Sequence, residues 1–159
     1  MSGQPSPEFL RRAIALATQN VATGKGGPFG AVVVRDGKVI GEGANSVTAN
    51  NDPTAHAEVN AIRAAARSIG AFTLQGCEIY SSCEPCPMCL AAAYWARLDA
   101  VYYGAAAADA AKAGFDDAFL YDELRKDPSR RKLRSTQFLR DEAWASFAAW
   151  IASPNKIGY

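Results

Sequence analysis

The sequence predicts a three-layer α/β/α sandwich around a mixed sheet. Stretches with a helical spacing of apolar residues alternate along the chain with short runs rich in β-branched and aromatic residues. The chain has 159 residues, of which 49% are hydrophobic, so it is long and apolar enough for one domain with a substantial core. No repeat, low-complexity tract or linker divides the sequence, and we therefore expect a single domain over residues 1–159.

The first half of the chain predicts a helix, a β-hairpin and a second helix. Ser6-Pro7 is typical of a helix start, because serine favours the N-cap and proline the first turn. Asp36-Gly37 favours a tight turn between two strands. The predicted elements are a helix over 6–21, strands over 31–35 and 39–44, a polar loop over 45–54 and a helix over 59–69 that Gly70 ends.

The second half continues the alternation of strands and helices. It predicts a strand over 77–82, a helix over 87–97, a strand over 100–103, helical pieces over 105–124, a weak fifth strand over 134–139 and a last helix over 141–152. The last helix carries one apolar stripe, formed by Trp144, Phe147, Trp150 and Ile151, that must be buried against something.

The charge balance argues against several classes of partner. The net charge is +1, from 17 basic and 16 acidic residues, which gives no global attraction to nucleic acid or membranes. No apolar run approaches the ~20 residues of a membrane span, and residues 1–12 lack the pattern of a signal peptide. We therefore expect a cytoplasmic protein.

One basic stretch departs from this balance. Residues 125–140 hold seven Lys and Arg residues against a single acid, Asp127, and this is the one feature that favours RNA. No aromatic residue that could stack on a base interleaves with the charges until Phe138. We interpret the stretch as a solvated connection and expect no nucleic-acid partner.

The residues that carry chemistry lie at two predicted helix starts. His56, the only histidine, is followed two residues later by Glu58, and Cys86 and Cys89 form a C-x-x-C pair after Pro85. Imidazole and thiolate are strong zinc ligands, and a helix N-terminus lowers the pKa of a thiol placed there. Residues two apart on a helix point about 200° from each other. His56 and Glu58 can therefore converge on one site only if the helix begins near His56.

The pattern His-x-Glu followed by Pro-Cys-x-x-Cys is the signature of zinc-dependent deaminases. Three protein ligands leave a fourth position of zinc for water, whose pKa the metal lowers, and a neighbouring unligated carboxylate can then move protons. Glu58 is the candidate for that proton shuttle, and His56, Cys86 and Cys89 are the candidate ligands of one zinc ion per chain.

Other interpretations of the cysteine cluster remain open on spacing alone. Cys83, Cys86 and Cys89 begin like an iron–sulfur motif, but Ala93 stands where that motif requires its fourth cysteine. Cys83 could instead complete a closed structural zinc site with the other three ligands. A redox C-x-x-C pair, or simple burial of these residues in a core, explains neither His56 nor Glu58.

The chain resembles the cytidine-deaminase-like superfamily, and within it the bacterial guanine deaminases. The motifs that carry the resemblance are His56-Ala57-Glu58, the run from Cys83 to Cys89, Gly26-Gly27-Pro28-Phe29-Gly30-Ala31, Asn45, Asp52-Pro53-Thr54-Ala55, Tyr94-Trp95-Ala96-Arg97, Gly114-Phe115-Asp116-Asp117 and Tyr159. The resemblance spans essentially the whole chain. It implies a central five-stranded sheet between helices, and it implies that Cys83 and Cys77 are not metal ligands.

The resemblance also implies a purine pocket. It assigns Phe29 and Trp95 to the apolar walls, Asn45 and Asp117 to the hydrogen bonds with the base, and Ala57 to the substrate site. The last residue, Tyr159, is implied to close over the base from a partner subunit, so that the segment 141–159 would be exchanged in a homodimer.

The implied reaction is hydrolysis of guanine to xanthine and ammonia. Guanosine deaminase and tRNA adenosine deaminase are the alternatives among enzymes. In a different class, a non-catalytic binding module stabilised by zinc would keep the metal but would have no use for Glu58.

Overall fold

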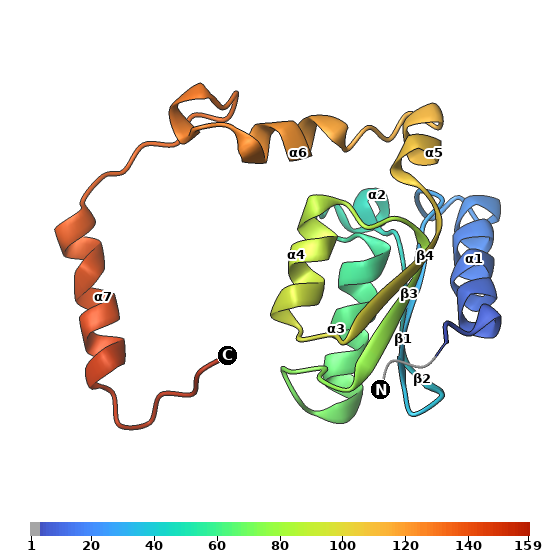
Figure 1. Ribbon diagram of the computed structural model, residues 1–159, viewed down its shortest axis with the longest axis horizontal. Helices are drawn as coiled ribbons and strands as arrows, with labels where there is room; N and C mark the ends of the chain where they lie inside the picture. The colour runs from blue at the N-terminus through green and yellow to red at the C-terminus, as the bar shows by residue number, and fades with distance from the viewer. Residues whose placement is uncertain (1–3) are drawn as a thin grey trace. The chain divides into compact units, whose positions relative to one another are not determined.

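The computed structural model describes residues 4–159, which form two compact units, one ending at Ala118 and the other running over Phe119–Tyr159. The first unit holds the sheet and its covering helices (Figure 1). Its elements are α1 (Pro7–Ala22), β1 (Gly30–Arg35), β2 (Lys38–Ala44), α2 (Val47–Asn50), α3 (Ala57–Ile69), β3 (Cys77–Cys83), α4 (Pro87–Trp95), β4 (Ala100–Ala105) and α5 (Ala107–Lys112).

The sheet is mixed, with the strand order β2-β1-β3-β4. β1 pairs antiparallel with β2 and with β3, whereas β3 and β4 are parallel. Asp36 and Gly37 both adopt positive φ in the turn between β1 and β2, which confirms the predicted tight hairpin. The parallel pair requires a crossover connection, and α4 provides it.

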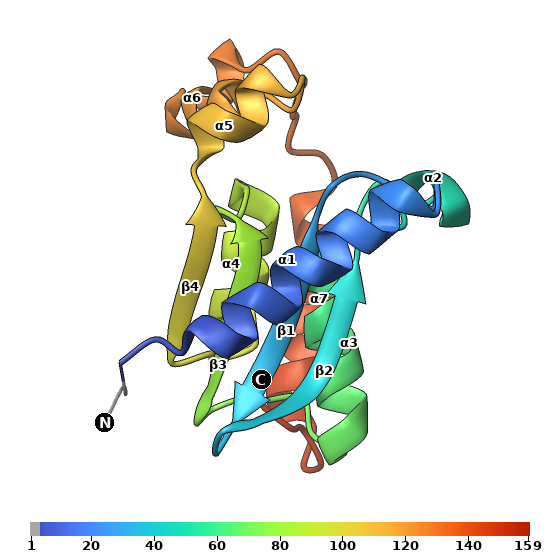
Figure 2. The same ribbon diagram turned by 90° about the vertical axis from the view of Figure 1, so that its right-hand side faces the viewer.

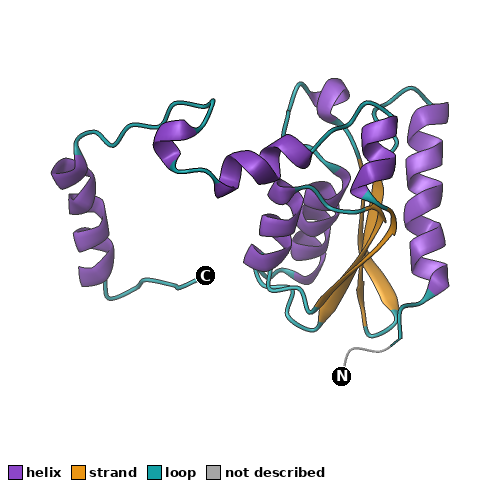
Figure 3. Cartoon of the chain, turned by 45° about the horizontal axis from the view of Figure 1, so that its top comes forward, coloured by secondary structure: helices purple, strands orange, loops and turns teal. Residues whose placement is uncertain are grey.

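Helices cover both faces of this sheet, which confirms the predicted layers. α1 crosses one face, and α3 and α4 lie on the other (Figures 2 and 3). On the α1 side, Val32, Val34 and Tyr80 pack with Phe9 and Leu10, and on the α3 side Val33 and Ile79 pack with the small residues Ala57, Ala61 and Ala65. Successive side chains of β1 and β3 point to opposite faces of the sheet, so these strands contribute to a separate core on each face.

The predicted fifth strand is wrong. Within the described residues the sheet has four strands, and residues 134–139 have no regular structure. The apolar residues of this segment are only Phe138 and Leu139, and both are exposed, at 80% and 52%. Leu139 moreover adopts a left-handed conformation. A strand is stabilised when it buries an apolar face or pairs with a neighbouring strand. This polar segment has too little apolar surface to bury a face.

The second unit is helical. It contains most of α6 (Ala118–Arg125), a 3₁₀ turn over Pro128–Arg130 and α7 (Arg140–Ala152), followed by the tail to Tyr159. In the basic stretch, Arg125, Lys126 and Arg140 form ion pairs with Asp122, Glu123 and Asp141. In residues 4–159 no helix combines the length and the apolar character that crossing a membrane requires.

Gly43 allows the start of α3 to lie directly against β2. A Cβ atom at this position would collide with the carbonyl oxygen of Ala57 and would lie 2.5 Å from the backbone nitrogen of Ala61. We predict that Gly43→Ala lowers the free energy of unfolding by about 1–3 kcal/mol, because the helix would have to move away. Urea denaturation measures this, with Gly158→Ala, whose added Cβ meets no atom within 4 Å, as the control. Equal midpoints for both variants would contradict the packing described.

Candidate metal and substrate site

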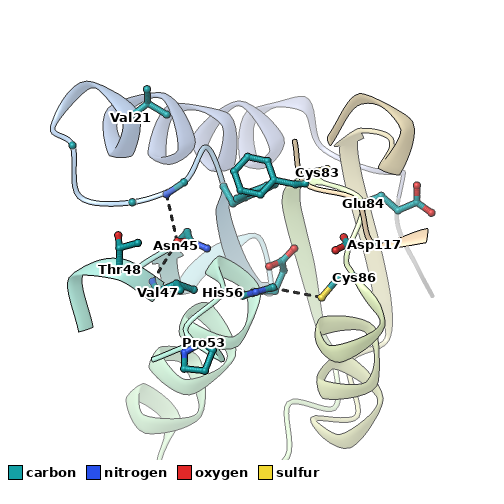
Figure 4. A pocket seen from close by; sticks show the side chains of 16 residues that line it. Val21, Asn45, Val47, Thr48, Pro53, His56, Cys83, Glu84, Cys86 and Asp117 are labelled. Atoms are coloured by element: carbon teal, nitrogen blue, oxygen red, sulfur yellow. Dashed lines mark hydrogen bonds between the residues drawn. The ribbon is translucent and has the colours of Figure 1, made fainter. Parts of the chain in front are cut away.

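The two helix starts that carry the motif meet in the first unit. His56 is the N-cap residue of α3 and Cys86 is the N-cap residue of α4, and both have extended backbone conformations. Because α3 begins only at Ala57, His56 lies outside the helical repeat, and it can converge with Glu58 on one site. This confirms the helix start that the His-x-Glu spacing requires. Figure 4 shows His56 and Cys86 directed toward each other.

The geometry of the three candidate ligands fits one zinc ion. The ligand atoms of His56, Cys86 and Cys89 all lie within 4.8 Å of one another. His56 Nδ1 lies 3.6 Å from Cys86 Sγ and 3.4 Å from Cys89 Sγ. In a tetrahedral site with ordinary Zn–S and Zn–N bond lengths, a nitrogen and a sulfur ligand are about 3.6 Å apart. The donor set therefore has the spacing of a zinc site with three protein ligands.

The two neighbouring thiols have opposite tendencies to lose a proton. The hydrogen bond from Cys89, together with that from His56, lowers the pKa of Cys86 to about 4, although burial opposes the shift. The same interaction with Cys86, together with burial, raises the pKa of Cys89. One sulfur is therefore a thiolate at neutral pH, and a cation bound between the two would displace the proton of the other.

Glu58 is a buried carboxyl that still reaches the site. Its side chain is 5% exposed, and burial raises its pKa above the usual range, although hydrogen bonds from Ser81 and Cys89 oppose that shift. Ser81 Oγ donates to Glu58 Oε1 at 2.9 Å. Glu58 also lines a cavity together with His56 and Cys86. A carboxyl in this environment can hold a proton or release one, as an acid–base group must.

The cavity has a volume of about 590 Å³, which is ample for a single purine base. Its wall combines glycines of the loop between α1 and β1, one end of α2, the helix starts and the segment after α5 (Figure 4). The lining residues are Val21, Gly24, Gly26, Gly27, Phe29, Asn45, Val47, Thr48, Pro53, His56, Glu58, Cys83, Glu84, Cys86, Phe115 and Asp117.

Asn45 is held in a defined orientation at this cavity. Its Oδ1 accepts from the backbone N–H groups of Gly27, at 3.4 Å, and Val47, at 3.3 Å. Since the oxygen faces these two donors, the Nδ2 group points the other way, toward the cavity (Figure 4). The side chain thus offers a donor to a ligand.

Two further predicted residues lie in the cavity wall. The ring of Phe29 meets that of Phe115 edge to face, with 4.9 Å between the ring centroids, so the pair forms a firm apolar wall. Asp117 lies among the same lining residues, and burial followed by the charge of Cys86 raises its pKa. Its carboxyl oxygens can accept hydrogen bonds from a ligand in the cavity.

The structure does not bring all the predicted substrate residues to this cavity. Trp95 is the last residue of α4, at the end opposite to the ligands, and it is 64% exposed with the guanidinium of Arg97 5.9 Å from its ring centroid. Ala57 is fully buried in the core against the sheet and does not appear in the cavity wall. Tyr159 belongs to the second unit.

Cys83 lines the cavity without joining the three ligands. Its sulfur lies 3.8 Å from the carbonyl oxygen of Ala106, and it is not in the group formed by His56, Cys86 and Cys89. Cys77 is buried in the core on the α3 side of the sheet. The geometry therefore favours three protein ligands over a closed site with four.

Sequence reasoning missed three residues that support the site. Asn20, buried on α1, donates from Nδ2 to the carbonyl oxygens of Gly27 and Asn45, at 2.8 and 2.9 Å. Ser81 bonds Glu58, and Glu84 accepts from the backbone N–H of Ala107 at 2.9 Å. The sequence does hold one indication of Asn20 and Ser81: each is a polar residue within an apolar face, of a helix and of a strand respectively. A buried polar group without a hydrogen-bond partner is costly, so a partner could have been expected.

Comparison with known proteins gives consistent matches. The family model described as the cytidine and deoxycytidylate deaminase zinc-binding region matches residues 4–105. A guanine deaminase from Bacillus subtilis is 54% identical over 151 residues, 95% of this chain and 97% of that protein. A solved structure of guanine deaminase from Bacillus subtilis aligns with a TM-score of 0.94 at 52% identity, covering 98% of this chain and 99% of that one.

A shorter match is to an enzyme that acts on tRNA. A tRNA-specific adenosine deaminase from Agrobacterium fabrum is 47% identical over 78 residues, which are 49% of this chain and 51% of that protein.

Proposed function

This chain belongs to the cytidine and deoxycytidylate deaminase family of zinc-binding proteins, and we propose that it hydrolyses guanine to xanthine and ammonia. The observation that supports guanine as the substrate is the 54% identity to guanine deaminase over nearly the full length of both proteins. A solved tRNA:A34 deaminase also aligns with 96% of this chain, but with only 29% identity and a TM-score of 0.60, against 0.94 for the guanine deaminase structure. The activity is a step of purine breakdown.

His56, Cys86 and Cys89 hold the zinc ion in this proposal. When bound there, zinc supplies a Lewis acid that lowers the pKa of water and makes it a nucleophile at neutral pH. The three residues come from two helix starts that the same core holds together, since α3 packs on β1 and β2 and touches α4. Such support keeps ligand atoms in place before the cation arrives.

Glu58 moves the protons. It takes one from the attacking water and delivers it to the ring nitrogen beside the carbon that carries the amine, which makes this carbon more electrophilic. It then carries the second proton of the water to the departing amine, so ammonia leaves and xanthine remains. Burial suits this alternation, because a carboxyl whose pKa is raised accepts a proton more readily than an exposed one.

Asn45, Asp117 and Phe29 recognise the base. Asn45 Nδ2 donates to an acceptor on the purine edge, Asp117 accepts from N–H groups on another edge, and the Phe29–Phe115 pair covers a face of the ring. Trp95 and Ala57 remain proposed substrate residues through the resemblance alone, and Ala57 would contribute through its backbone because its side chain is buried.

The proposed substrate is tested by release of ammonia from guanine, guanosine, adenine, cytosine and cytidine, assayed side by side. We expect guanine to have the highest kcat/KM. Equal or faster turnover of guanosine would refute the assignment to the free base and leave the deaminase assignment intact. Equal or faster turnover of adenosine in a tRNA anticodon stem would favour the tRNA alternative.

We further propose a homodimer that exchanges its C-terminal segment, 141–159, and supplies Tyr159 across the interface. The support lies in α7, whose Trp144, Phe147, Trp150 and Ile151 are each between 45% and 59% exposed within one chain. A helix with this much exposed aromatic surface needs a partner. In the proposed dimer, the ring of Tyr159 excludes water from the purine and its hydroxyl bonds the base.

Removal of Tyr159 tests this contribution. We predict that a chain ending at Gly158 turns guanine over roughly 10- to 100-fold more slowly, the factor expected for a lost hydrogen bond in a desolvated site. Its zinc content, and its dimer mass by light scattering, should match the full chain. Normal deamination of guanine by the shortened chain would show that the tail is dispensable.

A further inference from the structure

Ser81 is a polar residue in an apolar setting. It lies on β3, where Cys77 and Ile79 point to the same face and pack into the core on the α3 side. Only 1% of Ser81 is exposed. A hydroxyl in such a place costs stability unless it is hydrogen-bonded, and its partner is the catalytic carboxyl: Ser81 Oγ donates to Glu58 Oε1 at 2.9 Å.

The position of this hydroxyl is fixed by the sheet. Ser81 pairs with Ala31 of β1 on one side and with Tyr103 of β4 on the other, so its backbone is held from both sides. A side chain on a paired interior strand is placed more precisely than one on a loop. Glu58 reaches the site from the first turn of α3 through a longer side chain, which has more rotatable bonds than serine. The rigid partner therefore determines where the carboxyl lies.

We propose that Ser81 is a positioning residue that holds Oε1 of Glu58, so that the other oxygen, Oε2, carries every proton of the reaction. The inference rests on the proposed role of Glu58 as the shuttle. Rotation of the Glu58 carboxyl about its last bond would break the hydrogen bond from Ser81 to Oε1. In the proposal, Oε2 then faces the cavity that Glu58 lines, where the water and the ring nitrogen would bind.

This role differs from that of a hydrogen bond that only compensates for the burial of the Glu58 carboxyl. A purely structural hydrogen bond would affect the stability of the fold, whereas a positioning bond affects the rate after substrate has bound. Ser81 is not among the residues that line the cavity, so its removal should leave the affinity for the base nearly unchanged. The two roles therefore predict different changes in kcat and KM.

Ser81→Ala is the direct test. We expect kcat for guanine to fall about 10- to 100-fold, as for loss of a hydrogen bond to a charged group, with KM within about twofold. Zinc content should be unchanged. Ser81→Thr restores the hydroxyl and should recover most of kcat. A wild-type kcat for Ser81→Ala, or a loss confined to KM, would overturn the proposal.

The double variant separates Ser81 from other effects. If Ser81 acts only through proton transfer by Glu58, adding Ser81→Ala to Glu58→Gln should leave the residual rate unchanged. Equal losses in both backgrounds would mean that Ser81 acts by another route. If guanine proves not to be the substrate, the proposed function fails, but this comparison holds on any amine substrate that the enzyme deaminates.

A measurement without substrate tests the hydrogen bond itself. In protein labelled with ¹³C at glutamate carboxyls, the Glu58 signal is assigned by its loss in Glu58→Gln. We expect this signal to shift in Ser81→Ala and to return toward the wild-type position in Ser81→Thr. An unchanged signal in Ser81→Ala would contradict the proposal whatever the substrate.

Discussion

Glu58→Gln should lower kcat for guanine by at least about 10²–10⁴-fold, the range for loss of one general acid–base group. We expect a value at or beyond the upper end, because a single carboxyl serves several proton transfers in the proposed reaction. Glutamine keeps the size of the side chain and an oxygen that can accept from Ser81, so the packing around β3 should persist. Steady-state kinetics with guanine measures the effect.

Zinc analysis is the control for this variant. Glu58 is not among the three clustered ligands, so Glu58→Gln should retain one zinc per chain. Near-normal turnover with zinc in place would mean that another group moves the protons, and Asp117 would be the first residue to examine, since its carboxyl lies in the same cavity.

Cys86→Ala should abolish zinc binding and Cys83→Ala should not, although the two cysteines are only three residues apart. Removal of Cys86 takes away one of three ligand atoms, and we expect loss of zinc and of all measurable turnover. His56→Ala and Cys89→Ala should behave in the same way. Cys83→Ala should retain zinc and most activity, because the sulfur of Cys83 faces the carbonyl oxygen of Ala106.

Metal content by atomic absorption and a circular dichroism spectrum on the same samples would decide the matter. The spectrum identifies any variant that has lost zinc only because it has unfolded. Loss of zinc from a folded Cys83→Ala would indicate a closed site with four protein ligands, and it would remove the open position that catalysis needs.

Much of the fold could be predicted because its elements have local signals. The hairpin turn at Asp36-Gly37 and the end of α3 at Gly70 depend on positive φ, which the residue types reveal. The comparisons confirm the resemblance to guanine deaminases and the α/β class with a mixed sheet. The short helix α2 was not predicted, and a fifth strand was predicted that does not form. Both errors lie in polar segments with weak local preferences, whose structure depends on the surrounding chain.

The candidate metal ligands were predictable for a different reason. A single histidine and a C-x-x-C pair leave few ways to build a site, and zinc chemistry restricts them further. The support around the site was not predictable: nothing local indicates that Asn20 joins Gly27 to Asn45, or that Ser81 meets Glu58, because these contacts link residues from 7 to 25 positions apart. Trp95 was expected in the purine pocket from a family motif, but its side chain is exposed, because a motif does not reveal where a side chain lies.

Conversion of guanine in water enriched with ¹⁸O tests the central claim most directly. The zinc-loaded protein should release one ammonia per guanine and form xanthine that carries one ¹⁸O atom, on the carbon that held the amine, since hydrolysis takes the new oxygen from water. The same incubation with Glu58→Gln should give little product. Absence of xanthine from zinc-loaded, folded wild-type protein would contradict the assignment of this chain as a guanine deaminase.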